Sequence, residues 1–63
     1  MNELDSKMHE MMQTLIATAV DVEKFEDGNK SAGTRIRKNM QNVKNLAQQV
    51  RVEVQEMKNA VAA

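Results

Sequence analysis

Few side chains in this sequence have the type and spacing that catalysis needs. His9 is the only histidine, and its nearest plausible partner is Asp5, one helical turn away. A metal site of the helical-bundle type needs several convergent ligands and a Glu-x-x-His pair, which the sequence lacks. Glu23 and Glu26 lie one turn apart, but no apolar pocket is evident that would tune a carboxylate for acid–base work. We expect no enzymatic activity, no metal site and no cofactor.

The basic residues are more informative, because they recur at a fixed spacing. Every seventh residue from position 30 to position 58 is a cation, namely Lys30, Arg37, Lys44, Arg51 and Lys58. Rows of this kind often pair with acids of a neighbouring helix. In the register expected below, Glu26 reaches Lys30 and Asp5 reaches Arg51. Arg37 and Lys44 find no acid there, so pairing explains only part of the row.

A second polar group lies on the outward face of the same segment and contains no acid. Its cations crowd into the first turns of a helix, where free backbone N–H groups and the helix dipole already favour an anion. Ser and Thr hydroxyls are donors of the kind that contact phosphate oxygens. The candidate nucleic-acid-binding residues are therefore Lys30, Ser31, Thr34, Arg35, Arg37, Lys38 and Lys44. The sequence has one Phe and no Trp or Tyr, so recognition of single strands by base stacking is not expected.

The whole chain of 63 residues has a net charge of zero, with nine basic and nine acidic side chains. The charges are divided along the sequence. Residues 1–28 hold seven acids and two bases, a net charge of −5, and residues 29–63 hold two acids and seven bases, a net charge of +5. The 24 residues from Asn29 to Val52 contain no acid. Such a division indicates either internal pairing or a partner that binds one half.

Two helices must position these residues. Apolar side chains recur in steps of three and four from Leu4 to Phe25 and again from Ile36 to Val61, which predicts an antiparallel, coiled-coil-like hairpin. We expect helices at about 3–27 and 30–61, joined by a turn at 28–29, in one all-α domain covering residues 1–63. Gly28 suits the left-handed residue that closes a helix, and Asn29 caps the next one. Gly33 is expected on the inner seam opposite Phe25.

The expected hairpin leaves apolar surface without a partner. In this register Val22 meets Ile36, Leu15 meets Val43, and Leu4 meets Val54. Exposed apolar patches usually mark an interface, so we expect a homodimer that closes as a four-helix bundle. Its expected interface residues are Met12, Ile16, Ala19, Leu46, Met57 and Val61.

The stretch from Phe25 to Lys38 resembles the bacterial linker-histone-like family of the chlamydial type. Members carry a Gly-Asn-Lys-Ala-Ala-(Gly/Ala)-x-Arg-x-Arg signature between two helical segments. The matching residues here are Gly28, Asn29, Lys30, Ala32, Gly33, Arg35 and Arg37, while Ser31 replaces the commoner Ala. The later Lys44, Leu46, Arg51 and the run from Glu56 to Lys58 also resemble the second helix of the family.

The resemblance implies a small nucleoid protein that binds double-stranded DNA with little sequence preference. It implies that Lys30, Arg35 and Arg37 contact DNA and that Gly28 and Asn29 shape the turn. Well-known members append a long basic tail, which this sequence lacks, so strong condensation of DNA is not expected. The alternative is a structural or adaptor hairpin that binds a protein without nucleic acid. No apolar run is long enough to span a membrane. We expect a cytoplasmic, nucleoid-associated protein with no membrane or small-molecule partner.

Overall fold

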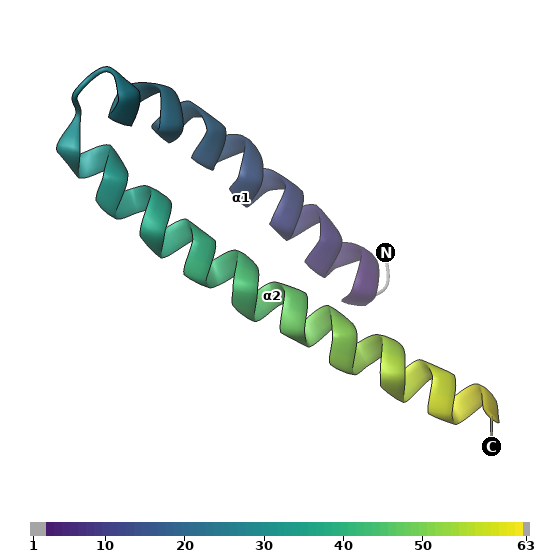
Figure 1. Cartoon of the computed structure of the whole chain (residues 1–63). Helices are drawn as coiled ribbons and strands as arrows, with labels where there is room; N and C mark the ends of the chain where they lie inside the picture. The colour runs from purple at the N-terminus through teal and green to yellow at the C-terminus, as the bar shows by residue number, and fades with distance from the viewer. Residues whose placement is uncertain (1–2, 63) are drawn as a thin grey trace.

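The computed structural model describes residues 3–62, with side chains for residues 3–60, as two helices side by side (Figure 1). Helix α1 runs from Glu3 to Glu26 and helix α2 from Lys30 to Ala62. The helices are antiparallel, and α2 continues well past the start of α1 (Figure 1). The described part of the chain measures 54 × 19 × 11 Å and contains no strand. The predicted all-helical hairpin is confirmed.

The turn between the helices follows from local backbone chemistry. Gly28 has a positive φ of 104°, a conformation that side chains with a Cβ disfavour. Its N–H donates to the carbonyl of Phe25 at 3.0 Å, and the N–H of Asn29 donates to the carbonyl of Lys24 at 3.0 Å. These two bonds form a Schellman motif, which satisfies carbonyls that the end of α1 leaves free.

Asn29 is the N-cap residue that precedes α2. Its Oδ1 accepts the backbone N–H of Ala32 at 3.3 Å and the hydroxyl of Ser31 at 2.7 Å. This is the arrangement of an N-cap side chain, which satisfies one of the free N–H groups of the first turn. The two helices therefore reverse direction within three residues.

We expect Gly28→Ala to lower the free energy of unfolding by about 1–2 kcal/mol, because an L side chain is strained at this φ. In a domain of this size that lowers Tm by roughly 5–10 °C, measured by circular dichroism. Gly28→Asn is the matched control, since Asn tolerates left-handed backbone and should lose less. Equal Tm values for the Ala variant and wild type would contradict this account of the turn.

The core is a single layer between the helices. Its best-buried apolar side chains are Ala32 and Leu46, at 0% and 5% exposure. Polar groups share the layer: Thr18 is buried, donates its hydroxyl to the carbonyl of Thr14 at 2.7 Å, and accepts the Asn39 side-chain amide at 3.1 Å. No buried side-chain polar atom among the described residues lacks a partner.

The expected apolar seam is wrong in its rotation. Met8, Leu15 and Val22 were expected between the helices but are 43%, 47% and 39% exposed. The positions one residue earlier, Lys7, Thr14 and Asp21, face α2 instead. The physical reason is polar pairing across the layer, since Lys7, Thr18 and Asp21 each contact a polar partner on α2. Met40 and Val54 on α2 are likewise exposed, whereas Ile36 and Val43 stay partly buried, so only part of each apolar stripe is turned out of the interhelical layer.

Phe25 closes the layer at the turn. A Cβ added at Gly33 would lie 2.7 Å from Cε1 of the Phe25 ring. Gly33 therefore lets the ring lie directly on the backbone of α2, as the sequence predicts for this pair. The ring stays half exposed, at 51%.

Candidate nucleic-acid interface

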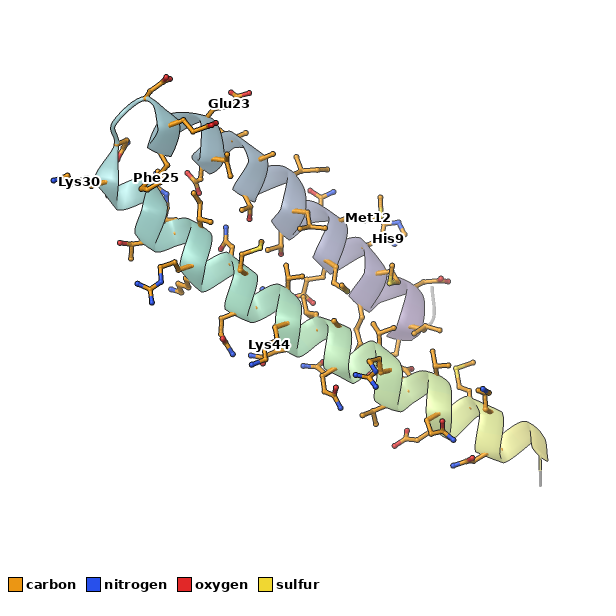
Figure 2. All side chains as sticks on the ribbon, in the orientation of Figure 1. His9, Met12, Glu23, Phe25, Lys30 and Lys44 are labelled. Carbon is orange, nitrogen blue, oxygen red and sulfur yellow. The ribbon has the colours of Figure 1, made fainter. Side chains whose placement is uncertain are left out.

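The start of α2 presents cations beside a capped helix terminus. Lys30 is the first residue of α2 and points outward at the turn end of the hairpin (Figure 2). The dipole of the 33-residue helix favours anions at this end. The first turn of α2 contains no acidic residue. Ser31 uses its hydroxyl hydrogen on Asn29, so Ser31 contributes to the cap in this structure.

Arg35 is held by a buried acid of the other helix. Its Nε donates to Oδ1 of Asp21 at 3.1 Å, and its Nη2 lies 3.0 Å from the same oxygen in an ion pair. Asp21 is only 8% exposed, while the Arg35 side chain is 46% exposed. A guanidinium carries five N–H donors in a fixed plane. The ion pair therefore fixes the direction of Arg35 and leaves further donors at the surface.

This pair is not among the contacts predicted from the sequence, in which Val22, and not its neighbour Asp21, meets α2. The signal that would have found it is the row Lys7, Thr14 and Asp21 at seven-residue spacing, each with a polar side chain. A polar row of this kind can face another polar row across a hairpin.

The remaining candidate cations divide between two sides of α2. Arg37 lines an open apolar groove of about 500 Å³ at the turn, together with Lys30 and Thr34. Lys44 lies farther along α2 and lines a separate groove with Arg51 (Figure 2). Lys38 is exposed and is turned about 100° around the helix from Arg37.

The predicted residues thus do not form one patch. Lys30, Thr34 and Arg37 meet around the groove, Arg35 and Lys38 lie on other sides of α2, and Lys44 lies about 10 Å along the axis from Arg37. Within the described part of the chain, Arg35 is the one member of the set that forms an ion pair.

We expect Asp21→Asn to strengthen binding of a polyanion several-fold, because it removes the charge that offsets Arg35 at the surface. The same change should lower stability by on the order of 1 kcal/mol, as a charged hydrogen bond becomes a neutral one. Fluorescence anisotropy with a labelled duplex and thermal unfolding measure the two effects. Glu56→Gln, which makes the same charge change on an exposed residue far from Arg35, is the control and should leave both nearly unchanged. Unaltered affinity in Asp21→Asn would show that Arg35 does not face the ligand.

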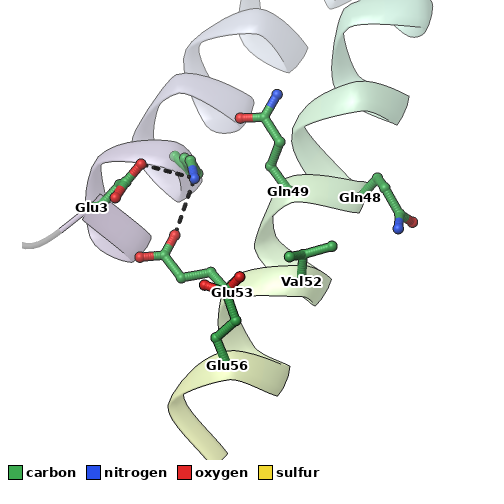
Figure 3. A pocket seen from close by; sticks show the side chains of 7 residues that line it. Glu3, Gln48, Gln49, Val52, Glu53 and Glu56 are labelled. Carbon is green, nitrogen blue, oxygen red and sulfur yellow. Dashed lines mark hydrogen bonds and ion pairs between the residues drawn. The ribbon is translucent and has the colours of Figure 1, made fainter. Parts of the chain in front are cut away.

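The opposite end of the hairpin carries a different cluster. Nζ of Lys7 lies 3.1 Å from a carboxylate oxygen of Glu3 and 3.1 Å from one of Glu53 (Figure 3). These hydrogen bonds raise the pKa of Lys7. The bond to Glu53 clasps α1 to α2, and its contribution to stability is present at neutral pH and lost only as the pH rises through the raised pKa. The cluster is a structural clasp that the sequence analysis missed.

The residues considered for catalysis stay apart. Nδ1 of His9 lies 2.9 Å from the backbone carbonyl oxygen of Asp5, and the ring is exposed. Glu23 and Glu26 are both exposed. No group of three or more His, Cys, Asp or Glu side chains among the described residues is placed to hold a metal ion.

Comparison with known protein families matches residues 3–60 to the family described as histone H1-like protein Hc1. The chain belongs to the Hc1 family. The matched segment includes all of α1, the turn and α2 as far as Ala60, so the resemblance seen between Phe25 and Lys38 is confirmed. Searches of curated proteins and of solved structures found no match. Within its described residues, this Hc1-family chain has no helix that is long and apolar enough to cross a bilayer.

Proposed function

We propose that this chain is a non-enzymatic, nucleoid-associated protein that binds double-stranded DNA through phosphate contacts at the turn and the first turns of α2. The observation that carries the proposal is the acid-free stretch of 24 residues from Asn29 to Val52, whose cations begin at a capped helix N-terminus. Membership of a histone H1-like family supports it independently.

The contacts in this proposal are electrostatic. Lys30 and Lys38 carry charges that no acid among the described residues neutralises. Arg35 and Arg37 supply planar donors suited to phosphate oxygens. Thr34 and Lys44 extend the surface, and Ser31 supports it through its bond to the cap residue Asn29. The sequence has one aromatic side chain, Phe25, which is too few to stack a series of unpaired bases. Phosphate contacts carry no sequence information, so the binding is sequence-tolerant.

The negative charge of α1 determines from which side DNA approaches the hairpin. The acidic residues of positions 1–28 give that half a net charge of −5. DNA approaching from the side of α1 is repelled, and DNA approaching the start of α2 is attracted. The zero net charge of the whole chain limits the affinity but does not prevent a local cationic surface.

The exposed apolar surface supports the homodimer as a second part of the proposal. Met12, Ile16 and Met57 are 54%, 60% and 49% exposed, and Ala19 is also exposed. A second copy that covers Met12 and Ala19 together with the apolar rows beside them would form a four-helix bundle, whereas Ile16, turned about 100° around α1 from Leu15, stays outside it. Leu46 is no longer included in this interface, because it is already buried within one hairpin. The side chain of Val61 lies outside the described residues.

Sequence tolerance is tested with three duplexes of equal length that are AT-rich, GC-rich and mixed. The proposal predicts Kd values within a few-fold of one another at 50 mM salt. A strong preference for one duplex would show that base readout contributes. If none of the three binds at this salt concentration, the adaptor function gains support instead, since electrostatic contacts are strong there.

A further inference from the structure

One face of the hairpin carries apolar side chains from both helices along its length. The groove at the turn fixes this face, because Val22 of α1 lines it together with Gly33 and Ile36 of α2. Residues seven apart lie in one line along a helix of this kind. The rows that continue from the groove are therefore Val22, Leu15 and Met8 on α1, and Gly33, Met40, Ala47 and Val54 on α2.

This apolar face is exposed to solvent in the single hairpin. Met8, Leu15, Met40 and Val54 are 43%, 47%, 38% and 39% exposed. They lie along both helices, so one partner with a matching pair of apolar stripes would cover them all. A second copy of this chain has such a pair.

The two edges of the face carry opposite charge. The α2 edge holds the row of cations. Lys30 and Arg37 line the groove at the turn, and the row continues at seven-residue spacing with Lys44 and Arg51. The α1 edge holds Glu23 and Glu26. Figure 2 shows Glu23 and Lys44 on opposite outer sides of the hairpin. Glu23, Glu26, Arg37 and Lys44 form no ion pair among the described residues, so their charges are available to a partner.

Two symmetric arrangements bring the apolar faces of two copies together. With the two-fold axis perpendicular to the helices, each helix packs on the same helix of the other copy, α1 on α1 and α2 on α2. The two turns then lie at opposite ends of the dimer. With the axis along the helices, α1 of each copy packs on α2 of the other, and the turns lie at the same end. The first arrangement opposes two rows of cations, whereas the second opposes acids and cations.

From this charge pattern we propose that two copies pair face to face with their turns at the same end. Pairing of Asp21 with Arg35 and of Lys7 with Glu53 sets the heights of the two helices. Since Asp21 pairs with Arg35, Glu23 lies at about the height of Gly33, roughly 6 Å or one helical turn from Arg37. A two-fold axis along the helices keeps this offset, which the long Arg37 side chain spans. Glu23 of each copy meets Arg37 of the other at the edge of the bundle.

This inference rests on the proposed function and makes it more specific. With the turns together, the starts of both α2 helices lie at one end of the dimer and act as one phosphate-binding surface. Lys38 lies about 100° around α2 from Arg37 and so stays outside the interface. The acidic starts of both α1 helices gather at the other end, away from DNA.

The arrangement is tested by the distance between two spin labels. The chain has no cysteine, so Asp27→Cys in the exposed turn gives one label for each copy. Neighbouring helices pack 8–10 Å apart, so turns at the same end place the labels within about 20 Å. Turns at opposite ends are separated by the length of α1, roughly 36 Å for its 24 residues. A distance near 36 Å, or a monomer by light scattering, would overturn the inference.

Charge reversal tests the edge contact itself. Glu23→Arg should raise the Kd of the dimer on the order of tenfold, because each dimer has two such contacts. Adding Arg37→Glu should restore the wild-type Kd, and Glu10→Arg, an exposed acid off this face, should change it little. Equal effects of Glu23→Arg and Glu10→Arg would also overturn the proposal. DNA binding is measured separately on the wild-type protein, because Arg37 is itself a proposed DNA contact. A wild-type monomer that binds DNA contradicts the dimer alone, and a wild-type dimer that does not bind DNA contradicts the proposed function alone.

Discussion

Replacing Lys30 and Lys38 by Gln should weaken binding to duplex DNA on the order of 100-fold at 50 mM salt. Each phosphate contact contributes a slope of about −0.9 to the dependence of log K on log salt concentration. Losing two contacts therefore makes that slope less steep by roughly 1.8, and the loss of affinity is largest at low salt. Both lysines lie outside the ion pairs of the hairpin, so the fold should survive. Fluorescence anisotropy gives the Kd, and circular dichroism checks helicity.

The matched control removes two cations from the far part of the same helix. Arg51→Gln with Lys58→Gln makes the same change in net charge, about 30 Å farther from the turn. If the binding surface is the start of α2, this control loses much less affinity than the Lys30 and Lys38 variant. Equal losses in the two variants would show that net charge, and not this surface, determines binding.

Leu46→Ala should lower the free energy of unfolding by about 2–3 kcal/mol. Leu46 is 5% exposed and is the largest buried apolar side chain described. Removing a buried Leu side chain costs both its transfer free energy and the cavity that it leaves. A small domain has little stability in reserve, and at roughly 4–8 °C for each kcal/mol the loss lowers Tm by roughly 8–24 °C. Thermal unfolding at a fixed protein concentration measures it.

Val52→Ala is the control for Leu46→Ala. Val52 is on the same helix but is 46% exposed, so its loss should change stability by about 0.5 kcal/mol or less. If Leu46→Ala and Val52→Ala lowered the free energy of unfolding by similar amounts, the core would not be the layer between α1 and α2.

Local chemistry explains why the turn could be predicted from the sequence. Gly28 and Asn29 act through bonds to residues within five positions of them, so the end of α1 and the start of α2 need no tertiary information. The contact of Phe25 with Gly33 was also predictable, because a turn this short leaves little choice of register.

The rotation of the helices could not be predicted in the same way. On α1, the row of Met8, Leu15 and Val22 and the row one residue earlier are equally regular, and an apolar stripe alone favours the first. The choice depends on pairs that form only after the hairpin closes, such as Thr18 with Asn39 and Asp21 with Arg35. The same pairs decide which candidate cations are free, so the sequence predicts the cationic stretch but not the ion pair that holds Arg35.

A salt titration shows whether the cations at the start of α2 bind DNA phosphates, because each phosphate contact changes the salt dependence of binding. A labelled mixed-sequence duplex is titrated with wild-type protein between 50 and 200 mM salt, and log K is plotted against log salt concentration. Four phosphate contacts for each hairpin predict a slope of about −3.6, and the Lys30 and Lys38 double variant should give about −1.8. A wild-type slope near zero, or the same slope in both proteins, would contradict the account.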